Sequence, residues 1–111
     1  MDDLVHRLSQ GDHAVTVGGP TPSLEEFKKR VEDMGYVFIK FTDTRGGTDL
    51  GVRVDKLATD LSKADFDQQV GVAHVEGTLT LNYVKVRCVA DIDLGTLNGT
   101  GHLVALEEVY P

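Results

Sequence analysis

The residues of this sequence whose types could do chemistry are concentrated in two short segments, VAHVEG and ADIDLG. His74 and Glu76 lie in the first segment, and Asp91 and Asp93 lie in the second. One imidazole and three carboxylates could bind a divalent metal ion, or could supply a general base with a raised pKa. His74, Glu76, Asp91 and Asp93 therefore form the candidate metal site of the sequence.

Two alternating stretches must position these side chains. Residues 72–81 and 86–94 alternate between apolar and polar types, which predicts two antiparallel strands joined by a loop of four residues. In that register Glu76 lies directly opposite Asp91, and like charges so placed destabilise a sheet. Two explanations of this pair remain open: the metal site, or an exposed lattice of salt bridges to basic residues on a neighbouring strand.

The glycine pair in the segment TDTRGGTDLG predicts another hairpin. Gly46 and Gly47 suit a two-residue type I′ turn, which needs positive φ at both positions. In that register Lys40 lies opposite Arg53, and the apolar side chains of the two strands share one face. These apolar side chains are Val37, Ile39, Phe41, Val52 and Val54.

The clearest helix signal covers residues 23–34. Ser23 and Glu26 have the spacing of a capping box, and Gly35 suits the left-handed position that ends a helix. One apolar stripe follows the helical period, which indicates a helix packed on a sheet. The stripe consists of Leu24, Phe27, Val31 and Met34.

Together these elements predict an α+β fold, with an antiparallel sheet of about five or six strands and one main helix packed on its apolar face. Hot-dog-like and cystatin-like folds share this order of strand, helix and strand meander. Such an analogy carries no function by itself. The length of 111 residues predicts a single domain, 1–111.

The last predicted strand indicates a covered surface. Residues 103–106 are apolar on both faces, as in a strand that is buried on both sides. One helix cannot cover both faces of a sheet. We therefore expect the second face to be covered by an N-terminal helix, through Leu4, Val5 and Leu8, or by a second chain in a homodimer, which we favour.

Composition and charge disfavour several classes of function. The 11 Lys and Arg residues and 18 Asp and Glu residues give a net charge of −7, which disfavours nucleic acid and anionic membranes as partners. No apolar segment is long enough for a membrane helix. The acidic N-terminus does not resemble a signal peptide, and a lone cysteine, Cys88, forms no internal disulfide, so we expect a cytoplasmic location.

No catalytic motif accompanies the candidate residues. The GxSxG, HExxH, CxxC and P-loop patterns are absent, and Cys88 lies on a predicted apolar face, where a thiol is usually inert. We therefore expect no cofactor, and a small acidic non-catalytic protein that acts through contacts, as an accessory subunit or partner-binding module. The alternative is a hot-dog-like or cystatin-like enzyme or binder, with a small apolar or acyl ligand in a groove between helix and sheet.

Overall fold

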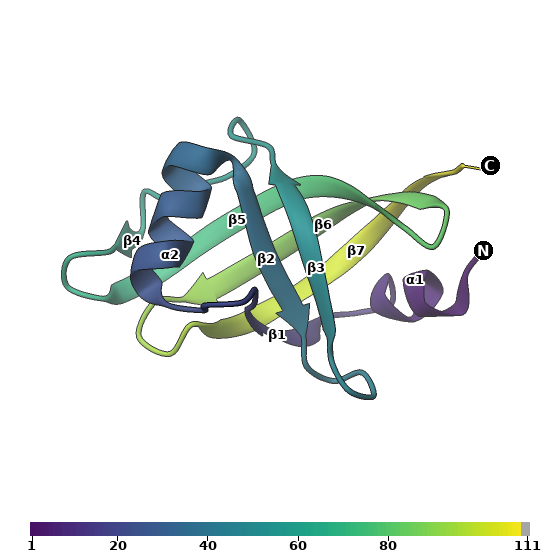
Figure 1. The fold of residues 1–111 in the computed structure, drawn as a ribbon, viewed down its shortest axis with the longest axis horizontal. Coiled ribbons are helices and arrows are strands. Elements are labelled where there is room, and N and C mark those ends of the chain that lie inside the picture. The colour runs from purple at the N-terminus through teal and green to yellow at the C-terminus, as the bar shows by residue number, and fades with distance from the viewer. Residues whose placement is uncertain (110–111) are drawn as a thin grey trace.

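A computed structural model describes residues 1–109, and antiparallel strands make up most of its regular structure. The strands are β1 His13–Val17, β2 Tyr36–Phe41, β3 Thr48–Val54, β4 Ala64–Asp65, β5 Val70–Leu81, β6 Val84–Asp93 and β7 Asn98–Glu108. The helices are α1 Asp3–Leu8 and α2 Leu24–Lys29, and α2 continues into the π-helical segment η1 Arg30–Met34. Figure 1 shows α1 and the end of β7 on the right, and α2 beside β4 on the left.

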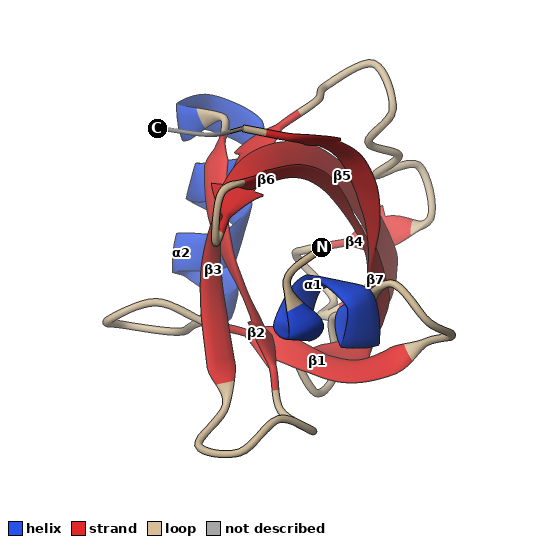
Figure 2. Cartoon of the chain, turned by 90° about the vertical axis from the view of Figure 1, so that its right-hand side faces the viewer, coloured by secondary structure: helices blue, strands red, loops and turns tan. Residues whose placement is uncertain are grey.

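The sheet closes on itself. Its strand order is β3-β2-β1-β7-β6-β5-β4, and β3 also pairs with β5, so that six strands form a ring with β4 outside it. Looking into one end of this ring, Figure 2 shows α1 within the opening. The inner face carries most of the core, in which 20 hydrophobic side chains are buried. The strands of the ring thus cover one another's apolar faces.

The predicted open sheet of five or six strands with one main helix on its apolar face is therefore wrong, as is the hot-dog-like or cystatin-like arrangement. The alternating pattern identified the side chains that share a face. It did not show whether that face is flat and covered by a helix or curled around its own side chains. Closure depends on the pairing of β3 with β5, a contact between residues such as Arg53 and Thr78 that are distant in sequence.

The helix signals are confirmed at both ends of the α2–η1 helix. The Ser23 hydroxyl accepts a hydrogen bond from the Glu26 N–H at 3.1 Å, and Gly35 ends η1 with a φ of 67°. Phe27 and Val31 are buried in the core. Val31 also lines a hollow of about 330 Å³ beside the helix, together with Glu32, Lys56, Thr59 and Leu61, so the small apolar ligand stays a prediction.

The N-terminal helix was expected as a possible cover, and it does contribute to the core. The Asp2 carboxylate accepts a hydrogen bond from the Val5 N–H and caps α1, and Val5 and Leu8 are fully buried. By contrast, Val104 and Leu106 on β7 stay 42% and 48% exposed. Within residues 1–109, no helix is long and apolar enough to cross a membrane.

The register of the β5–β6 hairpin differs from the predicted one by two residues. Leu81 pairs with Val84, and the turn consists of Asn82 and Tyr83, both with positive φ (49° and 63°). A slip of two residues keeps every side chain on its face, so the apolar pattern could not distinguish the two registers. The predicted opposition of Glu76 and Asp91 is wrong, because Asp91 lies opposite His74 and Glu76 opposite Val89.

The β2–β3 hairpin shows a similar shift. Gly46 and Gly47 have the expected positive φ, but Phe41 pairs with Thr48, so the connection spans residues 42–47 instead of two glycines. The shift is again an even number of residues and preserves the faces. It also places Lys40 opposite Asp49, so the predicted repulsion between Lys40 and Arg53 does not occur.

Candidate functional site

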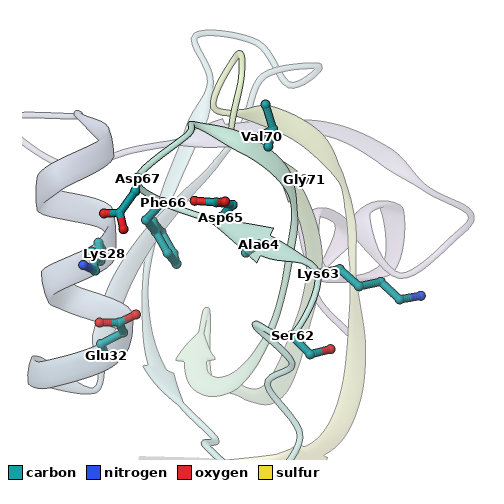
Figure 3. Close-up of a pocket in the computed structure, with 10 residues that line it drawn as sticks. All are labelled: Lys28, Glu32, Ser62, Lys63, Ala64, Asp65, Phe66, Asp67, Val70 and Gly71. Carbon is teal, nitrogen blue, oxygen red and sulfur yellow. The ribbon is translucent and has the colours of Figure 1, made fainter.

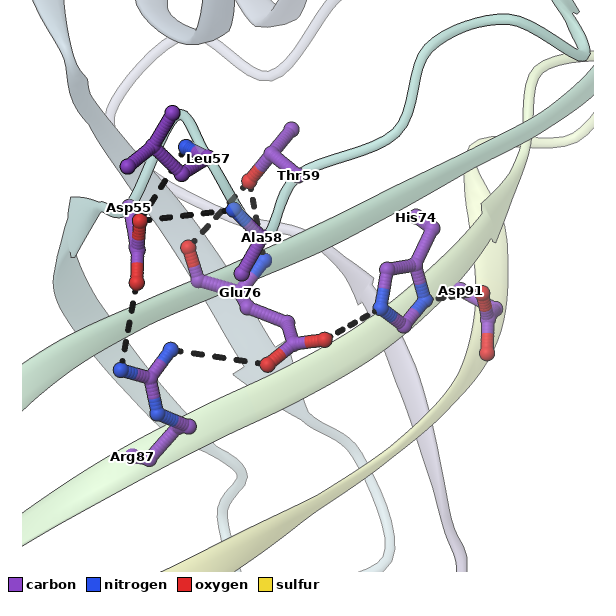
Figure 4. A network of polar contacts seen from close by, with 8 residues as sticks. All are labelled: Asp55, Leu57, Ala58, Thr59, His74, Glu76, Arg87 and Asp91. Carbon is purple, nitrogen blue, oxygen red and sulfur yellow. Dashed lines mark hydrogen bonds and ion pairs between the residues drawn. The ribbon is translucent and has the colours of Figure 1, made fainter.

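The structure brings together three of the four residues of the candidate metal site. His74 lies between two carboxylates, with Nε2 2.6 Å from a Glu76 oxygen and Nδ1 2.8 Å from an Asp91 oxygen (Figure 4). Asp93 is separate from this group, because its carboxylate accepts a hydrogen bond from the Gly95 N–H at 2.7 Å.

Two residues that the sequence reasoning did not include complete this polar network. The Arg87 guanidinium lies 3.2 Å from an Asp55 oxygen and 3.5 Å from a Glu76 oxygen. Asp55 follows β3, Glu76 lies on β5 and Arg87 on β6, so one cation ties three elements together (Figure 4). The signal that would have found Arg87 is the two-residue turn at 82–83, which brings it opposite Thr78, beside Glu76.

The electrostatics of the network favour a charged imidazole. The pKa of His74 is raised because Glu76 and then Asp91 hydrogen-bond to its ring. An imidazolium donates from both nitrogens and has no lone pair for a metal ion. Within residues 1–109, no group of three or more His, Cys, Asp and Glu side chains is arranged to hold a metal ion. The contacts describe an ion-pair network, and metal binding stays a prediction.

Cys88 lies inside the ring. Its side chain is 2% exposed, and burial raises the pKa of the thiol to about 12. A thiol that is neutral at physiological pH and closed off from solvent is a poor nucleophile.

The polar network lies over the seam where β3 and β5 close the ring. The Asp55 N–H donates to the Glu76 carbonyl at 2.8 Å, and Arg53 and Val54 pair with Thr78 and Gly77. A side chain at Gly77 would collide with the backbone of Arg53 and with Val52, so the close approach of β3 requires glycine here.

The ladder of this seam stops after Arg53 and Thr78, although both strands continue. The Val54 N–H donates to the Gly35 carbonyl on the β2 side, so by the alternation of a strand the backbone groups of Arg53 and Gly51 point towards β5. In the register of the seam the next partner of Gly51 would be Thr80. Neither of these residues takes part in a β3–β5 pair.

A groove of about 600 Å³ lies where the two strands diverge. In Figure 1, β3 meets β5 at its upper end and runs away from it below. The lining residues are Tyr36, Leu50, Gly51, Arg53, Thr78, Leu79, Thr80, Leu81 and Lys85. Leu79 and Leu81 belong to the inner-facing set of β5 but are only partly buried, because no strand covers them here.

A second groove lies beside the helix, and it differs in chemistry. Its volume is about 470 Å³, and Lys28 and Glu32 of the α2–η1 helix form one wall while residues 62–67 form the other (Figure 3). The Phe66 ring packs against Phe27 at a centroid distance of 6.3 Å. Charged side chains of both signs surround this groove, so it suits an apolar or acyl ligand poorly.

Comparison with known proteins gives no further guide to the site. No protein-family model matches this chain, and no curated protein sequence matches it.

Proposed function

We propose that this chain is a non-catalytic, cytoplasmic partner-binding protein, which accepts an extended segment of another protein as an added strand between β3 and β5. The observation that carries the proposal is the end of the β3–β5 ladder in an open groove, with the backbone groups of Gly51 and Thr80 directed into it. An unpaired strand edge is a template for another strand, and strand addition is a common mode of peptide recognition.

The groove offers side-chain contacts as well as backbone partners. Leu50 is one of its lining residues, and Leu79 and Leu81 are partly exposed along it. Because alternate side chains of a strand point to opposite faces, every second side chain of an added strand would cover these leucines. Each net hydrogen bond contributes only about 0.5–1.5 kcal/mol, so burial of the leucines is needed for useful affinity.

Proline at Thr80 tests the proposal. The Thr80 N–H points away from β6, so Thr80→Pro removes a donor that the free protein does not use in its ladder. Thr80→Val is the matched control, since it removes the hydroxyl and keeps the N–H. Random peptides displayed on phage and selected on the wild type should bind Thr80→Val and should fail to bind a folded Thr80→Pro variant.

Hydrogen exchange provides a second readout at the same residues. In the free protein the amides of Gly51 and Thr80 should exchange quickly, while those of Val52 and Leu79, which face β2 and β6, should be protected. A selected peptide should protect Gly51 and Thr80. Equal binding of peptides to Thr80→Pro, or slow exchange of both amides in the free protein, would contradict strand addition.

Self-association through a different surface stays a separate proposal. Val104 and Leu106 on β7 are exposed apolar side chains, which supports the homodimer expected from the sequence. Light scattering at micromolar concentration would test it, and Val104→Lys should convert the dimer to a folded monomer. A monomer in the wild type would reject the dimer.

A further inference from the structure

We propose that the segment bound between β3 and β5 is acidic, with carboxylates at the alternate positions that face solvent. This inference rests on the proposed function and adds the chemistry of the partner. It depends on the side chains around the groove, whose charges are positive although the chain as a whole is acidic.

The groove has a positive rim in an acidic protein. The chain carries a net charge of −7, yet the groove is lined by Arg53 and Lys85 and by no Asp or Glu. Within residues 1–109 neither of these cations forms an ion pair, whereas Arg87 pairs with Asp55 and Glu76. An anionic partner would supply the charges that the chain itself does not place there.

Of the groups that face Lys85 and Arg53 from neighbouring strands, one is acidic: Glu107, opposite Lys85. Lys85 lies opposite Thr80 on β5 and opposite Glu107 on β7, and no ion pair forms between Lys85 and Glu107. Arg53 lies opposite Tyr36 on β2 and Thr78 on β5, neither of which is charged at neutral pH. Both cations are exposed, so they remain available to a partner.

The charged side chains and the leucines that line the groove lie on opposite faces of the sheet. Arg53, Thr80 and Lys85 are exposed on the outer face of the sheet, while Leu50, Leu79 and Leu81 belong to the inner-facing sets of their strands. An added strand with a period of two would therefore place acidic side chains over the cations and apolar side chains over the leucines. The partner segment is expected to alternate between acidic and apolar residues.

The guanidinium of Arg53 gives this recognition directional character. An arginine presents a planar fork that can bind a carboxylate through two parallel hydrogen bonds. Lys85, on the other side of the groove, acts as a compact point charge. Charges at the rim of an interface mainly change the association rate and its dependence on salt.

The test compares two synthetic peptides of equal length, one alternating Glu and Val and the other alternating Gln and Val, both with blocked ends. Each is titrated into the full chain and followed by the NMR signals of Gly51 and Thr80. The Glu-Val peptide should bind at least about tenfold more tightly than the Gln-Val peptide, and its affinity should fall with added salt.

Matched variants distinguish the effect of the charges at the groove from the effect of the net charge of the protein on peptide binding. The double variant Arg53→Gln/Lys85→Gln should weaken binding of the Glu-Val peptide about tenfold and leave the Gln-Val peptide unchanged. The control is Lys29→Gln/Lys63→Gln, which makes the same change in net charge outside this groove and should leave both affinities unchanged.

Each remaining outcome has a distinct meaning. Equal binding of the two peptides, with shifts at Gly51 and Thr80, would overturn the acidic partner and leave strand addition standing. Binding of neither peptide would overturn both proposals. Protection of Gly51 and Thr80 in a self-associated free protein would identify a second copy of the chain as the occupant and would also overturn the acidic partner.

Discussion

The two halves of the β3–β5 seam are built from the same strands and behave differently. In the closed half, Asp55 pairs with Glu76 and Arg53 with Thr78, under the side chain of Arg87. In the open half, Gly51 and Thr80 have no partner across the seam. The backbone register would allow the ladder to continue, so the side chains around it decide where the ring closes.

A pair of glycines shows the same contrast. At Gly77, in the closed half, the space for a side chain is taken by the backbone of β3. At Gly51, in the open half, it is taken by the ring and hydroxyl of Tyr36, a side chain that is 42% exposed and packs edge-on against Phe38. Close backbone packing is thus confined to the half that Arg87 also holds.

The largest expected effect comes from proline at adjacent positions of β5. The Leu79 N–H belongs to the ladder with β6, so Leu79→Pro should destabilise the fold by about 3 kcal/mol or more. Thr80→Pro should cost only about 0.5 kcal/mol, because its N–H points into the groove. Chemical denaturation would measure both, and similar losses would show that the open half is paired in solution.

Alanine at the two glycines should give the next largest difference. Gly77→Ala forces β3 away from β5 and should cost about 1–3 kcal/mol, as overpacking usually does. Gly51→Ala displaces only the Tyr36 ring and should cost about 0.5 kcal/mol or less. Thermal melts of the two variants provide the comparison, and an equal cost would mean that the seam is uniform.

Removal of Arg87 should have a moderate effect on the closed half. Arg87→Met keeps the apolar stem and deletes the contacts with Asp55 and Glu76, which are partly exposed, so the loss should be about 1 kcal/mol. The amide of Asp55 should also exchange faster. Arg53→Met is the control in the open half and should leave stability unchanged, because Arg53 forms no ion pair within residues 1–109.

The smallest expected effect is a dependence of folding stability on pH, which arises from His74 at the edge of the closed half. Because the pKa of His74 is raised in the folded protein, its stabilising contribution is complete below pH 6.5 and is lost as pH rises through the folded-state pKa. His13 acts in the same direction. Desolvation is the largest single influence and lowers its pKa, but the interactions with Asp43 and with the Gln10 and Arg7 carbonyls together leave the pKa raised. His74→Gln should therefore reduce, by less than about 1 kcal/mol, the stability lost on going from acidic to alkaline pH.

The pH dependence of stability in the wild type and in His74→Gln distinguishes two outcomes. Melts of the wild type and of His74→Gln across this range should converge at high pH, where His74 is neutral in both states. Parallel curves would show that protonation of His74 contributes nothing to stability.

Local signals in the sequence predicted local structure well. Ser23 and Gly35 marked the ends of the main helix, and the apolar patterns assigned most of the core correctly, although Met34 of the predicted helix stripe is 51% exposed. These features depend on neighbours in the chain, so a single sequence contains the information. The type of the longer elements was therefore accessible before the structure, whereas the short strand β4 and the π-helical form of η1 were not predicted.

The registers and the site were less accessible, for a physical reason. A shift of an even number of residues leaves each strand's faces intact, so the pattern could not choose between Leu81 opposite Val86 and Leu81 opposite Val84. The groove depends on where two distant strands separate, and no local signal encodes that. The cluster of His74 with its carboxylates was found, but its link to Asp55 and Arg87 required the correct register.

The positive rim of the groove has a consequence for aggregation. Open strand edges invite pairing between identical molecules, and natural proteins often place lysine and other charges on them to prevent it. Two copies that met groove to groove would bring two Arg53 and two Lys85 side chains together, and the repulsion would oppose a continuous intermolecular sheet. This repulsion leaves the strand edge unpaired without promoting fibre formation. Concentrated solutions of Arg53→Gln/Lys85→Gln should therefore become turbid before those of the wild type.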